Sequence, residues 1–106
     1  MRELLDENLP HELRHEVVGH DVYTVQFTGW CGLKNGALLA QASAAGFDVM
    51  VTMDSGVRYQ QNLSTFPVAI VVLSAASNVI DDLSPLVPKL LETLKTLSPK
   101  TVVRIG

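Results

Sequence analysis

The sequence predicts an α/β fold built on a mostly parallel sheet of about five strands. Two observations lead to this prediction. Short apolar runs of strand length alternate with segments of helical periodicity, which is the pattern of repeated βαβ units. Residues 68–73 are all apolar, as expected of a parallel strand that is covered on both faces. With 106 residues, the chain has the size of one domain spanning residues 1–106.

Composition narrows the class of protein. Hydrophobic residues make up 47 % of the chain and charged residues 18 %, which is enough apolar material for a core. No apolar run has the length of a membrane helix, and the N-terminus lacks the apolar region of a signal peptide, so we expect a cytoplasmic protein. The net charge of −3 argues against strong autonomous nucleic-acid binding. The same net charge is compatible with an enzyme that binds phosphate groups through a metal ion.

The first half of the chain is predicted to begin with a strand at 2–5 and a helix that Asn8 caps. Pro10 is tolerated in the first turn of that helix, and Gly19 ends it. The inward face of the helix is expected to carry Leu9, Leu13 and Val17. A β-branched and aromatic run predicts a second strand at 21–25.

The middle of the chain is predicted to contain a loop over 28–34 and a helix from Asn35 to Gly46. A strand follows at 48–53, and residues 56–64 form either a short helix or a turn. The residues of the Asn35 helix that pack inward are expected to be Leu38, Leu39 and Ala42.

The last part of the chain predicts one long amphipathic helix, capped by Ser84 with Pro85 at its first position. Ser98-Pro99 ends this helix, and residues 101–105 form a closing strand. The apolar stripe of the helix consists of Leu83, Leu86, Val87, Leu90, Leu91, Leu94 and Leu97.

Two aspartates carry the main functional signal, because each follows a predicted buried strand. Asp6 follows the first strand and Asp54 follows the third. Ligands of open α/β sheets bind at the carboxyl ends of strands, and two carboxylates brought together there need a cation or a proton. We therefore expect Mg²⁺ or Mn²⁺ held by Asp6 and Asp54 as catalytic carboxylates, with Glu7 as a further candidate ligand. Thr52 is expected to orient a ligand or water.

Other polar residues have a functional and an ordinary interpretation. Asn8 is either a helix cap or a site residue, and Glu7 is either a ligand or a solvated charge. Lys34 and Asn35 form either a polar turn with a cap or a phosphate contact at a helix N-terminus. Asn62 follows two glutamines in a segment that is either a solvated loop or a substrate contact.

The histidines and the cysteine are predicted to be structural. His11 and His15 have the i, i+4 spacing of metal ligands, but no third ligand follows at a familiar zinc interval. They flank glutamates and are expected on a polar outer face. Cys31 has no cysteine partner, so it is expected to be a buried or half-buried thiol.

In the order of its motifs, the chain resembles a bacterial family of small PIN-like proteins of unknown function. The matching motifs are LLDENLP at 4–10, GHDV at 19–22 and VTMD at 51–54, and the likeness extends to 29–30, 34–36 and 60–63. The nearest understood relatives of that family are the PIN-domain ribonuclease toxins of toxin–antitoxin modules. The resemblance covers nearly the whole chain and implies a three-layer α/β/α PIN-like domain.

The resemblance implies a metal-dependent ribonuclease, with Asp6 and Asp54 matching two acids of the PIN site around Mg²⁺ or Mn²⁺. It also implies RNA as substrate, an antitoxin protein as partner and a homodimer. The chain departs from the PIN pattern because the helix after Lys34 contains no acid before Asp48. Ser55-Gly56-Val57 also stands where relatives carry a second acid.

Three functions are therefore in competition. The first is the metal-dependent ribonuclease. The second is a catalytically degenerate PIN-like interaction module, which the reduced acid set favours. The third is a receiver-like phosphoacceptor domain, since acids after the first strand and an aspartate after the third are also its arrangement. A receiver has a lysine after its last strand, where this chain has Arg104-Ile105-Gly106.

Overall fold

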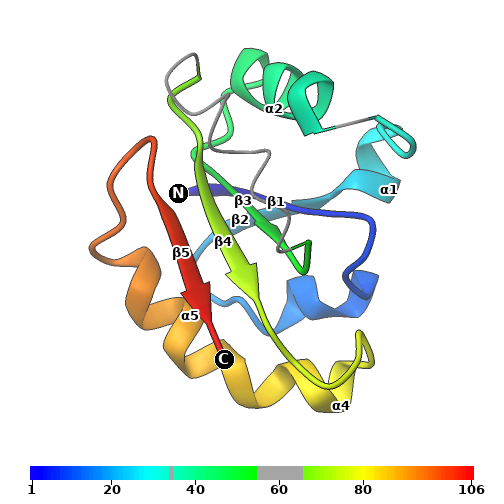
Figure 1. Cartoon of the computed structure of the whole chain (residues 1–106), viewed down its shortest axis with the longest axis vertical. Coiled ribbons are helices and arrows are strands. Elements are labelled where there is room, and N and C mark those ends of the chain that lie inside the picture. Colours follow the sequence, from blue (N-terminus) through cyan, green and yellow to red (C-terminus); the bar gives the residue numbers. More distant parts are fainter. Residues whose placement is uncertain (34, 55–65) are drawn as a thin grey trace.

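A computed structural model describes residues 1–33, 35–54 and 66–106 of the chain (Figure 1). Five strands form one sheet in the order β2-β1-β3-β4-β5, and every neighbouring pair is parallel. The strands are β1 (Arg2–Leu5), β2 (Asp21–Thr24), β3 (Val49–Thr52), β4 (Ala69–Leu73) and β5 (Val102–Ile105). The predicted α/β class and the five-stranded parallel sheet are confirmed, with strand bounds within one or two residues of the expected ones.

The core divides between the two faces of the sheet, because successive side chains of a strand point to opposite faces. Along β4, Ala69, Val71 and Leu73 belong to one apolar cluster, while Ile70 and Val72 belong to the other. We call these the α5 face and the α2 face, after the helices that pack on them. Figure 1 shows these helices on opposite sides of the strands.

The α2 face is covered by α1 (Val25–Thr28) and α2 (Asn35–Ala44). The Thr24 hydroxyl caps α1 by accepting a hydrogen bond from the backbone N–H of Phe27 at 3.1 Å. Helix α1 lies where the sequence predicted the end of a strand and the start of a loop. Helix α2 agrees with the prediction, and its inward residues are buried as expected: Leu38, Leu39 and Ala42.

The predicted first helix is wrong in type, because only a 3₁₀ helix, η1 (His11–His15), forms there. Asn8 does not cap it. The N-cap position is Pro10, which makes no side-chain cap bond, and the Asn8 amide bonds elsewhere. The backbone turns already at Leu9, whose N–H donates to the carbonyl of Asp6. The apolar spacing was nevertheless informative, since Leu9, Leu13 and Val17 are all buried on the α5 face.

The predicted long C-terminal helix, expected from the Ser84 cap onward, is shorter and begins with the 3₁₀ turn η3 (Ser84–Leu86) before α5 (Val87–Leu94). A further short helix, α4 (Ile80–Leu83), lies before the predicted start. Pro85 and Pro88 lack the N–H that a continuous helix needs, which accounts for the 3₁₀ turn between the helices. Ser84 is not a cap, because its hydroxyl donates to Glu16 at 2.8 Å. The stripe still packs on the α5 face through Leu83, Val87, Leu90 and Leu94.

Two connections of the sheet have opposite hands. The β1–β2 connection through η1 and the β4–β5 connection through α5 both lie on the α5 face, yet they step toward opposite edges of the sheet. Only one of them can therefore be the usual right-handed crossover. As a result, the described helices that pack on the α2 face all come from the β2–β3 connection.

None of the helices formed by the described residues has both the length and the apolar character needed to cross a membrane.

Candidate functional site

The candidate site lies at the carboxyl ends of β1 and β3, which are neighbours at the centre of the sheet. From β1 the chain proceeds to β2 on one side, and from β3 it proceeds to β4 on the other. Ligands of open parallel sheets bind where the strand order reverses in this way. The backbone therefore brings the ends of these two strands to the expected position for a site.

Asp6 is the first residue after β1 and is only 8 % exposed. Its backbone N–H extends the pairing of β1 with β3 by donating to the carbonyl of Val51 at 2.9 Å. Both of its carboxylate oxygens accept hydrogen bonds: Oδ1 from the backbone N–H of Glu7 at 2.8 Å, and Oδ2 from the Thr52 hydroxyl at 2.7 Å. The carboxylate is thus held in one orientation by two donors.

Thr52, the last residue of β3, connects the polar groups of the site and is fully buried. Its Oγ1 donates to Asp6 and accepts from the Asn8 amide at 3.1 Å and from the backbone N–H of Asp54 at 3.0 Å. A hydroxyl has one hydrogen and two lone pairs, so these three bonds use its whole capacity. The predicted orienting role of Thr52 stays a prediction, but its bonds fix Asp6 and the backbone of Asp54 relative to each other.

Asn8 reaches the same cluster from the loop after β1. Its Nδ2 donates to Thr52, and its Oδ1 accepts from the backbone N–H of Met53 at 3.2 Å. The carbonyl of Asn8 also accepts from the side chain of Asn78 at 3.3 Å. Of the two interpretations of Asn8, the structure places its side chain at the strand ends and leaves the helix without its cap.

Asp54 and Glu7 are both exposed, and the structure places them differently. The backbone of Asp54 is tied to Thr52, two residues beyond the end of β3. The Glu7 carboxylate accepts from the backbone N–H of Gly32 at 3.1 Å, and the Glu7 carbonyl accepts from Gln26 at 3.3 Å. Glu7 therefore joins the loop after β1 to α1 and the turn that follows it.

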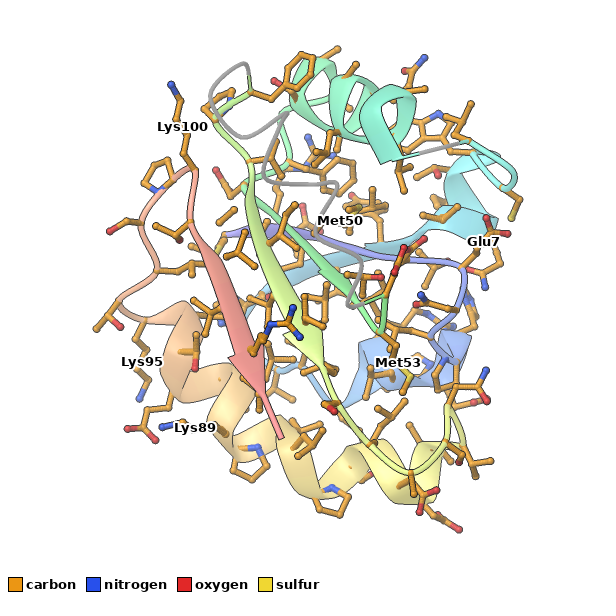
Figure 2. All side chains as sticks on the ribbon, viewed as in Figure 1. Glu7, Met50, Met53, Lys89, Lys95 and Lys100 are labelled. Carbon is orange, nitrogen blue, oxygen red and sulfur yellow. The ribbon has the colours of Figure 1, made fainter. Side chains whose placement is uncertain are left out.

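The remaining predicted contacts are only partly covered by the structure. Lys34 and Asn62 lie outside the described residues, and the backbone of Asn35 begins α2. The other lysines, Lys89, Lys95 and Lys100, lie on the opposite side of the view from Glu7 and Met53 (Figure 2). They are therefore remote from the strand ends where the acids lie.

A cavity of about 210 Å³ lies beside the site, at the ends of β3, β4 and β5. Sequence reasoning missed Arg104 as a residue of this region. The register provides the signal, since Val72 lies opposite both Thr52 and Arg104 and the three side chains share one face. At Gly106 a Cβ would come within 2.1 Å of the Ser74 carbonyl, so this position requires glycine. The lining residues are Met53, Val72, Leu73, Ser74, Ala75, Arg104 and Gly106.

The histidine prediction holds for the exposed His15, while His11 faces the sheet, and the cysteine prediction is wrong. The His11 residue is also exposed, but its Nδ1 lies 2.8 Å from the Thr24 hydroxyl of β2. Cys31 is exposed rather than buried, because it lies in a turn that is closed by the N–H of Leu33 donating to the carbonyl of Trp30. Its neighbours Trp30 and Leu33 pack against the core of the α2 face instead.

The oxygen donors at the strand ends fit Mg²⁺ or Mn²⁺ in kind but are few in number. The described residues contain no group of three or more histidine, cysteine, aspartate or glutamate side chains placed to hold a metal ion. Mg²⁺ is commonly bound through one or two carboxylates and keeps several waters, so Asp6 and Asp54 supply the minimum set.

No family model, curated protein or solved structure matches this chain. The PIN-like resemblance therefore stays a prediction from the sequence motifs.

Proposed function

We propose that the protein is a Mg²⁺- or Mn²⁺-dependent ribonuclease that holds its metal with Asp6 and Asp54. The observation that carries the proposal is the Thr52 hydroxyl, which bonds to the Asp6 carboxylate and to the backbone of Asp54 at the point where the strand order reverses. A polar network at this position orients acidic groups without contributing to the apolar core.

Each residue of the network has a distinct role in the proposal. Asp6 is the buried, fixed ligand, and Asp54 is the exposed ligand that faces water and substrate. Thr52 and Asn8 are positioning residues, because their side chains bond to the Asp6 carboxylate, to each other and to the backbone N–H groups of Met53 and Asp54. Asp6 and Asp54 would hold the metal, which would supply an acidified water for attack on a phosphodiester and positive charge near the developing negative charge.

The proposal is tested by calorimetry with Mn²⁺ on the wild type and on the Asp6→Asn and Asp54→Asn variants. We expect binding by the wild type and none by either variant, because each amide removes a charged ligand. Asp21→Asn is the matched control, since Asp21 lies at the start of β2, at the other end of the sheet. Single-stranded RNA should be cut only with the metal, and Asp6→Asn should abolish cutting. Full activity of Asp6→Asn would contradict the mechanism.

The sequence resemblance also favours the toxin role, with an antitoxin protein as partner. Induced expression is then expected to arrest bacterial growth, and Asp6→Asn should relieve the arrest.

A second candidate is an interaction module that keeps the fold without catalysis. The observation that favours it is the small number of acids, since the described residues contain no cluster of three metal-binding side chains. Wild-type protein that neither binds Mn²⁺ nor cuts RNA with metal present would select this candidate.

The strand order also favours a third candidate, the phosphoacceptor domain, because β2-β1-β3-β4-β5 is the order of flavodoxin-like sheets. In that case Asp54 would be phosphorylated by a small phosphodonor such as acetyl phosphate, and Asp54→Asn would not be. Intact-protein mass spectrometry separates this candidate from the nuclease.

A further inference from the structure

A second cavity, of about 230 Å³, opens on the other side of the candidate site, at the edge of the sheet. It is formed by η1, the edge strand β2 and α1. Thr24 lies opposite Leu5, the residue before Asp6, so the cavity is one strand away from the proposed metal ligand. The lining residues are His11, Arg14, Val22, Tyr23, Thr24 and Phe27.

Phe27 is the most unusual residue of this cavity, because its large apolar side chain is 72 % exposed. The N-terminus of α1 fixes it, since its backbone N–H donates to the Thr24 hydroxyl. Its ring lies 5.9 Å from the ring of Tyr23, centre to centre, and is tilted by 39°. Two adjoining rings held by the backbone provide a surface on which a planar ligand can stack.

Basic groups stand beside these rings. Arg14 is half-buried, and its Nη1 donates to the carbonyl of His11 at 2.8 Å. That bond uses one of the five N–H donors of a guanidinium and holds the head group in place. Nδ1 of His11 lies at hydrogen-bonding distance, 2.8 Å, from the Thr24 hydroxyl. Among the described residues that line the cavity none is acidic, so the Arg14 guanidinium gives this lining a positive charge although the chain carries −3.

We propose that this cavity binds a nucleotide that neighbours the cleaved phosphodiester: the base stacks on Phe27 and the adjoining phosphate contacts Arg14. The inference rests on the proposed ribonuclease function and names the part of the chain that positions its substrate. A flat ring surface next to a guanidinium is the combination that single-stranded nucleic acids require, because every base has a stacking face and every nucleotide a negative charge.

The charges favour a nucleotide over a second copy of the chain as the occupant. A two-fold contact would use the same patch on both copies and so bring the two Arg14 guanidinium groups into one interface. Like charges placed together in this way oppose association. An oligonucleotide brings the opposite charge.

The test measures binding of a fluorescein-labelled single-stranded RNA by anisotropy, in EDTA so that no metal-dependent step occurs. Phe27→Ala should weaken binding by about tenfold, the usual contribution of one stacked base, and Phe27→Trp should restore it. Val18→Ala is the matched control, because Val18 is 66 % exposed but does not line the cavity. It should bind like the wild type.

An RNA of the same length with one abasic position at each possible register identifies stacking directly. At one register, removing the base should reduce the affinity of the wild type about tenfold, and it should not reduce the affinity of Phe27→Ala any further. Arg14→Gln should reduce the dependence of affinity on salt by about one phosphate contact.

Several results would overturn the inference. One is equal binding of intact and abasic RNA by the wild type at every register, and another is no binding of RNA at all. A third is a Phe27→Ala variant with unchanged affinity and an altered sedimentation coefficient, which would assign the patch to a contact between copies. None of these results depends on Mn²⁺ binding, so failure of the metal site and failure of this subsite are distinguishable.

Discussion

The two ends of β1 each bury an acid, and the two acids are treated in opposite ways. At the carboxyl end, both oxygens of Asp6 accept hydrogen bonds. At the amino end, Glu3 is 0 % exposed, and neither of its oxygens has a hydrogen-bond partner. An ionisable neighbour is His20, whose Nδ1 lies 3.3 Å from Oε2 without the geometry of a hydrogen bond. Hydrogen-bond donors surround the carboxyl group of Asp6, and none of the described residues donates to that of Glu3.

The difference has a measurable result at Glu3. Burial raises the pKa of its carboxyl to about 7, and the N-terminal amine partly opposes this. Burial lowers the pKa of His20, with the N-terminal amine acting in the same direction. Near neutral pH the Glu3 carboxyl is therefore about half protonated. Depth of burial alone therefore does not identify a functional acid, because the hydrogen-bond donors around a buried carboxyl group decide whether its charged form is stable.

The largest expected effect is on stability at the amino end. Because the pKa of Glu3 is higher in the folded state than in the unfolded state, its contribution to stability is complete below about pH 4.5 and is lost as pH rises through 7. Glu3→Gln should therefore raise the free energy of unfolding by about 3 kcal/mol at pH 8 and change it little at pH 4.5. Urea unfolding at several pH values measures this.

His20 is present in both proteins and lies 3.3 Å from Oε2 of Glu3, so the difference between the curves reports Glu3 together with its effect on His20. His20 itself acts in the other direction. Its lowered pKa makes stability fall as pH falls through its ordinary value of 6.5. Parallel curves for the wild type and Glu3→Gln would show that Glu3 does not bind its proton on folding.

The next effect is at the carboxyl end, where Thr52→Val keeps the shape of the side chain and removes the hydroxyl. Asp6 loses a donor, and the Asn8 amide and the Asp54 N–H lose their acceptor. We expect a loss of about 2 kcal/mol in unfolding free energy, with much weaker Mn²⁺ binding. Thr101→Val is the control, since that exposed hydroxyl bonds only locally, to the carbonyl of Ser98. Unchanged Mn²⁺ affinity in Thr52→Val would mean that Thr52 does not position the acids.

The smallest expected effect on unfolding free energy comes from replacing the acid at the carboxyl end of β1 by its amide, the same change made at the amino end. Asp6→Asn should destabilise the protein by about 1 kcal/mol at pH 8. The amide nitrogen of asparagine is a donor, and it replaces a carboxylate oxygen that accepted a hydrogen bond, so one bond is lost. Glu3→Gln should stabilise it at the same pH. Thermal unfolding of the two variants side by side gives the signs, and equal signs would remove the distinction between the two ends.

Much of the fold can be predicted from the sequence, because the spacing of apolar residues identifies buried strands and the inward faces of helices. The position of Asp6 follows in the same way, because this charged residue comes directly after the apolar pair that ends the first strand. The role of Asn8 cannot be predicted in this way, since the local sequence is the same whether its side chain caps a helix or bonds to Thr52. The 3₁₀ turn at η3 could have been inferred from Pro85 and Pro88 together. The burial of Glu3 was missed although a parallel strand covered on both faces leaves it no exposed side.

The pairing of β1 with β3 also has a consequence for folding. Strand β1 precedes β2 and α2 along the chain, and its second partner, β3, follows only after them. Until β3 arrives, one edge of β1 exposes backbone groups beside the apolar side chains of Leu4 and Leu5, and such edges promote aggregation. Because non-local parallel pairing is slow to form, the acids of the proposed site come together only late in folding.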